Sequence, residues 1–289
     1  MKLPNLGSFW MLIAALGFAI MGALVKVGAA KFSSAELVFY RSIFGLMAIY
    51  AYIFAKKLPL ATPVMSKQMS RGLVGFASLV LFFYAIAHLP LATAVTLNYT
   101  SALFLALLMP LMLHEKPKPI LYAMILLGFV GVVLLLKPSF AKQDLIAGAV
   151  GLSSGFGAAF AYVHVKQLGN LGEPDWRTVF YFTLISTIAS AIWMLLQTYT
   201  PITWQDMPTL LGLGTSATIA QLAMTRAYRT GKTLTVASLA YTTVIFASLF
   251  GVLFWQETLS LSEYVAIGII IISGIISANV TKNPTKMPK

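Results

Sequence analysis

The composition of the chain excludes a water-soluble protein. Of its 289 residues, 59% are hydrophobic and 10% charged, none is cysteine, and the formal net charge is +12. A soluble domain carries about 25% charged residues, so this chain lacks the polar surface that water requires, and we expect an all-α integral membrane protein. The lack of cysteine excludes disulfides and cysteine-ligated metals.

Ten apolar stretches are long enough to cross a bilayer as helices, which takes about 20 residues each. In chain order they span 8–29, 35–55, 71–88, 92–113, 119–136, 145–165, 175–197, 208–228, 233–255 and 262–280. Only 56–70 is a connection of any size, so no soluble domain is expected. The first stretch exceeds the roughly 7–15 apolar residues of a signal peptide, and we expect it to remain as a helix.

The positions of the basic residues predict the orientation. With the N-terminus inside, fifteen of the twenty Lys and Arg residues fall on the cytoplasmic side, three fall outside, and Lys26 and Arg41 lie within helices. The positive-inside rule then places both termini in the cytoplasm. The positive charge thus reflects topology. We expect the lipid bilayer as a partner and no nucleic acid, and the sequence leaves a homodimer open.

The second half of the chain repeats the first. A shift of 142 residues aligns matching positions: Thr93 with Thr235, Leu97 with Leu239, Tyr99 with Tyr241, Thr100 with Thr242, and Glu115 with Glu257. Each half, 1–140 and 141–289, holds five predicted helices. Because five is odd, the second half must enter the membrane from the opposite face. The sequence therefore predicts two inverted five-helix repeats, an architecture of many secondary transporters.

Several blocks match a known pattern. They are Phe39-Tyr40-Arg41, the block 89–101, Glu115, Gly128 and Gly131, with a weaker match at Glu257 and Gly268. Through them the chain resembles the drug/metabolite transporter superfamily, specifically bacterial proteins with two EamA domains. The resemblance implies a ten-helix carrier of the bacterial inner (plasma) membrane, often an exporter of amino acids or other small metabolites. Phe182 stands where the repeat would place a second Arg41, so no paired arginine is expected.

Hydroxyl side chains mark a predicted substrate site. They recur at i, i+3 and i+7 on one face of each of two helices: Thr93, Thr96 and Thr100 in the first half, and Thr235, Ser238 and Thr242 in the second. Asn98, Tyr99 and Tyr241 lie beside them, and hydroxyls with phenol rings suit polar or zwitterionic solutes. The resemblance adds Tyr84 and Gln221, with His164 and Thr225. The alternative is that these hydroxyls bond carbonyls of their own helices and mark close packing.

Charged residues have separate predicted roles. Arg41 lies about two turns into its helix, where it pairs with Glu36, binds a substrate carboxylate or bonds helix carbonyls; the resemblance favours a structural role. Glu115 and Glu257 end equivalent helices at opposite faces and are predicted to gate or cap them. Because no carboxylate lies at mid-membrane, a carboxylate-based proton relay is not favoured. We expect no cofactor and no metal.

The function predicted from these features is secondary transport. We expect a carrier that moves a small polar organic metabolite, amino-acid-like and exported, by alternating access. The alternatives are a carrier for S-adenosylmethionine, a riboflavin-like vitamin or a drug cation, a channel, or an intramembrane enzyme. The enzyme alternative rests on Gly151–Gly155, which spells G-x-S-x-G, and a nucleophilic Ser153 would need His88 as its base. Nothing in the sequence orients that histidine, so an enzyme is not expected.

Overall fold

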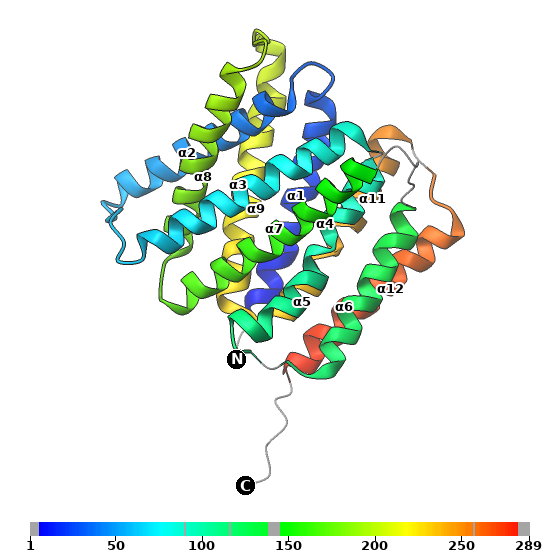
Figure 1. Ribbon diagram of the computed structural model, residues 1–289. Coiled ribbons are helices and arrows are strands. Elements are labelled where there is room, and N and C mark those ends of the chain that lie inside the picture. Colours follow the sequence, from blue (N-terminus) through cyan, green and yellow to red (C-terminus); the bar gives the residue numbers. More distant parts are fainter. Residues whose placement is uncertain (1–5, 90, 116, 138–144, 257, 283–289) are drawn as a thin grey trace.

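A computed structural model describes residues 6–89, 91–115, 117–137, 145–256 and 258–282, and within them every regular element is a helix (Figure 1). In a helix the backbone N–H and C=O groups bond to each other, which a membrane requires because lipid offers them no hydrogen-bond partners. In chain order the helices are α1 (Leu6–Gly28), α2 (Ser34–Ala55), α3 (Met65–His88), α4 (Leu91–Tyr99), α5 (Ser101–Met112), α6 (Pro119–Leu136), α7 (Leu145–Asn170), α8 (Asp175–Leu195), the short η2 (Trp204–Asp206), α9 (Met207–Thr230), α10 (Thr233–Ala240), α11 (Thr242–Trp255) and α12 (Leu261–Lys282).

Two of the predicted helices, 92–113 and 233–255, are each divided into two pieces. The first is divided at Thr100, between α4 and α5, and the second at Tyr241, between α10 and α11. At each division a threonine hydroxyl donates to the carbonyl three residues earlier: Thr100 Oγ1 to Leu97 at 2.5 Å, and Thr242 Oγ1 to Leu239 at 2.7 Å. Such local bonds compete with the helical backbone pattern. The spans are present as predicted, and the divisions correct their continuity.

The membrane-spanning character of the chain is confirmed. Among the described residues, nine spans are long and apolar enough to cross a bilayer. Helix α9 is not among them, although its 24 residues make it as long as the others. Its threonines, Gln221 and two arginines lower its mean hydropathy, and it still packs inside the bundle against α1.

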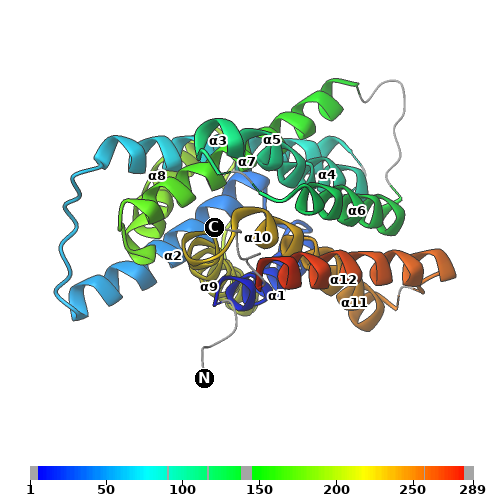
Figure 2. The same ribbon diagram turned by 90° about the horizontal axis from the view of Figure 1, so that it is seen from below.

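The main packing pairs each join one helix from each half of the chain. Helix α1 packs on α9, α3 on α7, α2 on α8, and α6 on α12. Both views place α6 and α12 side by side at one edge of the molecule, away from α2 and α8 (Figures 1 and 2). The two halves are therefore intermixed rather than packed as separate bodies.

The two ends of the described chain lie on one side of the molecule. Helix α1 begins and α12 ends at the lower side of Figure 1, which we call the terminal face; the opposite side is the far face. Since successive spans cross in alternate directions, the α2–α3 and α7–α8 connections belong to the terminal face. The α1–α2 and α8–α9 connections belong to the far face.

Candidate substrate site and its two closures

Four tyrosines form a cluster inside the bundle. Tyr99 and Tyr241 stand at the two helix divisions, with ring centroids 6.1 Å apart. Tyr162 of α7 stacks on Tyr228 of α9, with centroids 5.0 Å apart and an angle of 17° between the rings. The structure thus brings Tyr99 and Tyr241, one from each half of the chain, close together. Sequence reasoning missed Tyr162 and Tyr228, whose only signal was a polar ring inside an apolar helix.

Arg41 lines a small cavity between α2, α8 and α9. Only 7% of Arg41 is exposed. The other residues that line the cavity are Ser42, Phe182, Thr183, Ala217, Thr218 and Gln221. Its volume is about 10 Å³, close to the minimum for one water molecule. Glu36 does not pair with Arg41, because its carboxylate is bonded to Ser33 and Thr200 instead.

A second buried arginine, Arg71 of α3, lies next to this cavity. Its exposure is 3%, and its guanidinium carbon lies 4.3 Å from the ring centroid of Phe182, in the range of a cation–π contact. The span expected at 71–88 would put Arg71 at its cytoplasmic end. The helix instead begins at Met65, because polar residues extend it beyond the apolar stretch. Arg71 therefore lies within the helix and is buried in the bundle.

The predicted hydroxyl residues are divided between different surroundings. Thr96 and Thr100 are buried near the first helix division. Thr235 Oγ1 donates to the Ser277 carbonyl at 3.3 Å, and Ser238 Oγ accepts from Ser277 Oγ at 3.1 Å, so these two face α12. The Thr93 side chain lies outside the described residues. That any of these hydroxyls, including Thr242, contacts substrate stays a prediction.

The remaining predicted lining residues are also spread out. Asn98 Nδ2 donates to Ser154 Oγ at 3.2 Å, between α4 and α7. Tyr84 is exposed and stacks on His88, with ring centroids 4.0 Å apart. Gln221 is 5% exposed and belongs to the Arg41 cavity. Of these three residues, Gln221 is therefore the one that lines the same cavity as Arg41.

The G-x-S-x-G stretch forms local helix contacts. Ser153 Oγ donates to the Ala149 carbonyl at 2.8 Å, and the His88 ring is bonded to the Tyr84 carbonyl through Nδ1 at 2.9 Å. Each side chain is thus bonded within its own helix, and neither contact is a nucleophile–base hydrogen bond.

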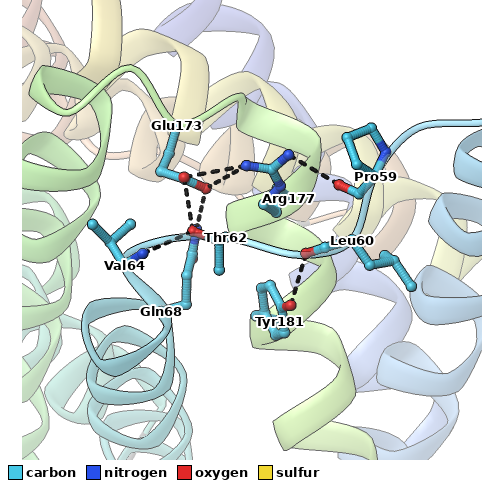
Figure 3. Close-up of polar contacts among 8 residues, drawn as sticks. All are labelled: Pro59, Leu60, Thr62, Val64, Gln68, Glu173, Arg177 and Tyr181. Atoms are coloured by element: carbon cyan, nitrogen blue, oxygen red, sulfur yellow. Dashed lines mark hydrogen bonds and ion pairs between the residues drawn. The ribbon is translucent and has the colours of Figure 1, made fainter.

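At the terminal face, a buried carboxylate ties the α2–α3 connection to the start of α8 (Figure 3). Glu173 accepts from Thr62 Oγ1 at 2.8 Å, from Gln68 Nε2 at 2.9 Å and from Arg177 Nη1 at 3.2 Å. Arg177 Nη2 donates to the Pro59 carbonyl at 2.9 Å, and the Tyr181 hydroxyl donates to the Leu60 carbonyl at 2.8 Å. We call the residues drawn in Figure 3 the terminal closure: Pro59, Leu60, Thr62, Val64, Gln68, Glu173, Arg177 and Tyr181.

At the far face, another buried carboxylate ties the start of α2 to the α8–α9 connection. Glu36 accepts from the Ser33 amide at 2.8 Å, the Thr200 amide at 2.7 Å and the Thr200 hydroxyl at 3.2 Å. The Ser33 hydroxyl accepts from the Glu36 amide, which completes a capping box on α2. We call Ser33, Glu36 and Thr200 the far closure. It carries no cation among the described contacts of Glu36.

Glu115 joins three helices at the terminal face. Its carboxylate lies 3.9 Å from Lys166 Nζ and accepts from Thr233 Oγ1 at 3.1 Å. Lys166 Nζ also donates to the Gly231 carbonyl at 3.0 Å. Glu115 therefore lies where a gate or cap was predicted, and either role stays a prediction. Its counterpart Glu257 lies outside the described residues.

The comparison with known families covers nearly the whole chain. The sequence profile described as "EamA-like transporter family" matches residues 5–137 and again residues 145–278. The chain belongs to the EamA-like transporter family. It is therefore a multi-pass membrane transporter, and its substrate is a small molecule, as the sequence resemblance implied.

Relatives of this EamA-like transporter include proteins with named cargo. The pseudopaline exporter CntI of Pseudomonas aeruginosa is 32% identical over 270 residues, which cover 93% of this chain and 94% of that protein. The riboflavin transporter of Vibrio cholerae is 26% identical over 234 residues, covering 78% and 76% respectively. A solved structure, described as a crystal structure of a protein, superposes with a TM-score of 0.82 at 19% identity over 96% of this chain and 98% of its own. At that identity the superposition supports the fold alone.

Proposed function

We propose that this EamA-like transporter is a secondary carrier that exports a small polar organic metabolite by alternating access. The observation that carries the proposal is a polar interior site with a closure at each face. The cavity of Arg41 and Gln221 lies between α2, α8 and α9, and with both closures shut its volume is about 10 Å³, so it must widen to admit a metabolite. The terminal closure and the far closure bind opposite ends of the α2–α8 pair. A carrier needs two such barriers, which open in turn.

An inverted repeat of 1–140 and 141–289 is part of the proposal, and the helix packing supports it. Under the repeat, α7, α8 and α9 correspond to α1, α2 and α3. The contact of α1 with α9 then corresponds to that of α7 with α3, and the contact of α2 with α9 corresponds to that of α8 with α3. The divisions at Thr100 and Tyr241 fall at related positions. Two interchangeable halves give inward- and outward-open states of similar energy.

An amino-acid-like cargo is our first candidate for the substrate. Arg41 and the amide of Gln221 offer donors to a carboxylate, and the relative CntI is named as an exporter. We place the protein in the bacterial inner membrane, with the terminal face in the cytoplasm, because the connections there carry most of the lysines and arginines.

A riboflavin-like solute is the second candidate, and the tyrosine cluster favours it. The rings of Tyr99, Tyr162, Tyr228 and Tyr241 lie close together in the interior, and planar aromatic solutes stack on such rings. A relative is named as a riboflavin transporter. The two candidates differ in whether a carboxylate or an aromatic ring dominates recognition.

Counterflow in proteoliposomes tests the proposed function. Purified protein is screened by thermal shift against amino acids and riboflavin, since a ligand of the folded state raises its melting temperature. Each solute that stabilises it is then loaded inside vesicles and its labelled form added outside. We expect transient accumulation above equilibrium. Flux that does not respond to solute on the opposite side would indicate a channel and overturn the carrier.

A matched pair of tyrosine substitutions controls this experiment. Tyr241→Ala removes a fully buried ring of the cluster, whereas Tyr264→Ala removes a ring that is 61% exposed on α12. We expect counterflow to fall at least tenfold in the first variant and to stay within twofold in the second. For orientation, a single cysteine at either terminus should resist an impermeant thiol reagent applied to cells; labelling would reverse the assignment of faces.

A further inference from the structure

The interior of the bundle holds polar donors for which the described chain supplies no acceptor. Arg71 Nε and Nη1 and Gln221 Nε2 are buried without a hydrogen-bond partner among the described residues. The contacts described for Arg41 likewise include no hydrogen bond and no ion pair. Because unpaired buried donors are costly, and all of these groups donate, a ligand that satisfies them must bring acceptors.

We propose that Arg41 and Arg71 together bind an organic anion with at least two negative charges. This inference rests on the carrier function proposed above. The two guanidinium groups lie within electrostatic range of each other, and Phe182 connects them. The Arg71 guanidinium carbon lies 4.3 Å from the centroid of the Phe182 ring, and Phe182 also lines the Arg41 cavity. A guanidinium binds carboxylate or phosphate oxygens in pairs, so two of them match two anionic groups of one solute.

The carboxylates of the two closures are already engaged by other donors. Glu36, five residues before Arg41, accepts three donors in the far closure. Glu173 accepts from Arg177 and two neutral donors in the terminal closure. The two closures therefore keep their carboxylates away from Arg41 and Arg71, and the charge of these arginines remains free to meet a substrate.

Other basic residues of the chain show what a structural cation looks like here. Arg177 pairs with Glu173 at 3.2 Å, Arg229 with Asp175 at 2.8 Å, and Lys166 lies 3.9 Å from Glu115. Each of these pairs lies near a helix end. Arg41 and Arg71 are more deeply buried and repel each other, and a dianion would offset both the burial and the repulsion.

The test compares solutes that differ in charge. Glutarate, glycerol 3-phosphate and glutamine are each added at equal concentration and ionic strength to the purified full-length protein, and the melting temperature is measured. We expect glutarate or glycerol 3-phosphate to raise it more than glutamine. Which of the two is stronger distinguishes carboxylate from phosphate recognition. Equal shifts for all three solutes would overturn the proposal.

Substitutions then assign the effect to the two arginines. Arg41→Gln and Arg71→Gln should each weaken the apparent affinity for the preferred dianion at least tenfold, and Arg71→Lys should retain part of it. Arg226→Gln is the matched control, because the Arg226 guanidinium also stacks on a ring, that of Trp10, at 4.6 Å from the centroid, but lies outside the cavity. The affinity of this variant for the dianion should stay within twofold of that of the parent. A dianion preference that survives both glutamine variants would overturn the proposal.

The ligand-free melting temperature separates binding from a structural role. Removing an uncompensated buried charge should leave Arg71→Gln as stable as the parent or more so, whereas loss of a structural cation would lower the melting temperature. Failure of this inference is distinguishable from failure of the carrier. Counterflow of a neutral or zwitterionic solute without any dianion effect overturns only the anion site. A dianion effect lost in Arg71→Gln, without counterflow of any solute, overturns only the carrier.

Discussion

The terminal closure and the far closure use the same device with different chemistry. In each, a buried glutamate holds a connection from the other half of the chain against one end of the α2–α8 pair. Glu173 accepts from a cation, Arg177, as well as from Thr62 and Gln68 (Figure 3). Within the described part of the chain, Glu36 accepts from two backbone amides and a hydroxyl, those of Ser33 and Thr200. One closure is an ion-pair network and the other is a set of neutral donors around a carboxylate.

This difference predicts which face opens more readily. Opening the terminal closure separates Thr62 and Gln68 from the Glu173 carboxylate that accepts from them. It also separates the Pro59 carbonyl from the Arg177 guanidinium that donates to it. Opening the far closure replaces two neutral donor groups of Thr200 with water. All of these bonds involve a charged group and are charge-assisted. Opening the terminal closure breaks three of them, those of Thr62, Gln68 and Arg177, whereas opening the far closure breaks the two of Thr200, so we expect the far closure to open first. A site that opens readily to the far face suits release on that side, in agreement with the export that we propose.

The largest effect is expected from Glu173→Ala. The substitution removes the acceptor of three side chains and leaves Arg177, 12% exposed, without its carboxylate. Loss of one partner from a buried pair costs about 3 kcal/mol of unfolding free energy, measured by denaturant titration in micelles. The terminal face should also open, so that a cysteine at position 42, introduced by Ser42→Cys in the cavity lining, reacts faster with an impermeant thiol reagent applied from that side.

The control for Glu173→Ala is Lys137→Gln. The Lys137 ammonium pairs with Glu263 at 3.3 Å, but the lysine side chain is 53% exposed, and exposed pairs contribute about 0.5 kcal/mol or less. The chain has no native cysteine, so the labelling reports position 42 alone. Equal stability losses in the two variants, or faster labelling from the far face in Glu173→Ala, would contradict the assigned difference between the closures.

A smaller effect is expected from Glu36→Gln. The amide keeps one acceptor oxygen but turns an NH₂ group toward the donors of Ser33 and Thr200, so about 1.5 kcal/mol of unfolding free energy should be lost. Labelling of the cysteine at position 42 should accelerate from the far face and not from the terminal face. Acceleration from the terminal face would show that the two closures do not act on separate sides.

The sequence predicted the spans better than the site. Apolar length is a local property, and nearly every predicted span is found as a helix or as two consecutive pieces. The divisions at Thr100 and Tyr241 were missed because a threonine bonding its own helix leaves no pattern in hydropathy. Arg71 was missed for a related reason: the polar residues 66–70 read as a connection, while the helix begins at Met65.

Placing the predicted hydroxyl residues required knowledge of the partner helices. The spacing of Thr235 and Ser238 correctly put them on one helical face, but which neighbour that face meets depends on tertiary packing, and here it is Ser277 of α12. Tyr99 and Tyr241, which were named from matching positions of the two halves, lie with their rings close together. Glu173 and Arg177 could not be singled out from the sequence, because a charged pair beside a connection is common. Their role depends on the α2–α3 connection packing against them in the folded chain.

The smallest effect is expected at the surface beside the far closure, where Lys31 pairs with Asp206. The Lys31 ammonium and the Thr203 amide and hydroxyl hold the pKa of Asp206 at about 2. A lowered pKa stabilises the fold fully above the unfolded value near 3.8, and this contribution is lost as the pH falls toward 2. The difference in melting temperature between the parent and Asp206→Asn should therefore stay constant from pH 8 to pH 5 and shrink below about pH 4.

This surface pair also separates closure from simple surface charge. If the far closure depends on the Glu36 contacts alone, Asp206→Asn should leave labelling of the cysteine at position 42 unchanged from both faces, although it removes an ion pair only a few residues away from Thr200. Raising the salt concentration should reproduce the small stability loss of Asp206→Asn and leave that of Glu36→Gln in place. Faster far-face labelling in Asp206→Asn would mean that the exposed pair, rather than the buried carboxylate, holds the far face shut.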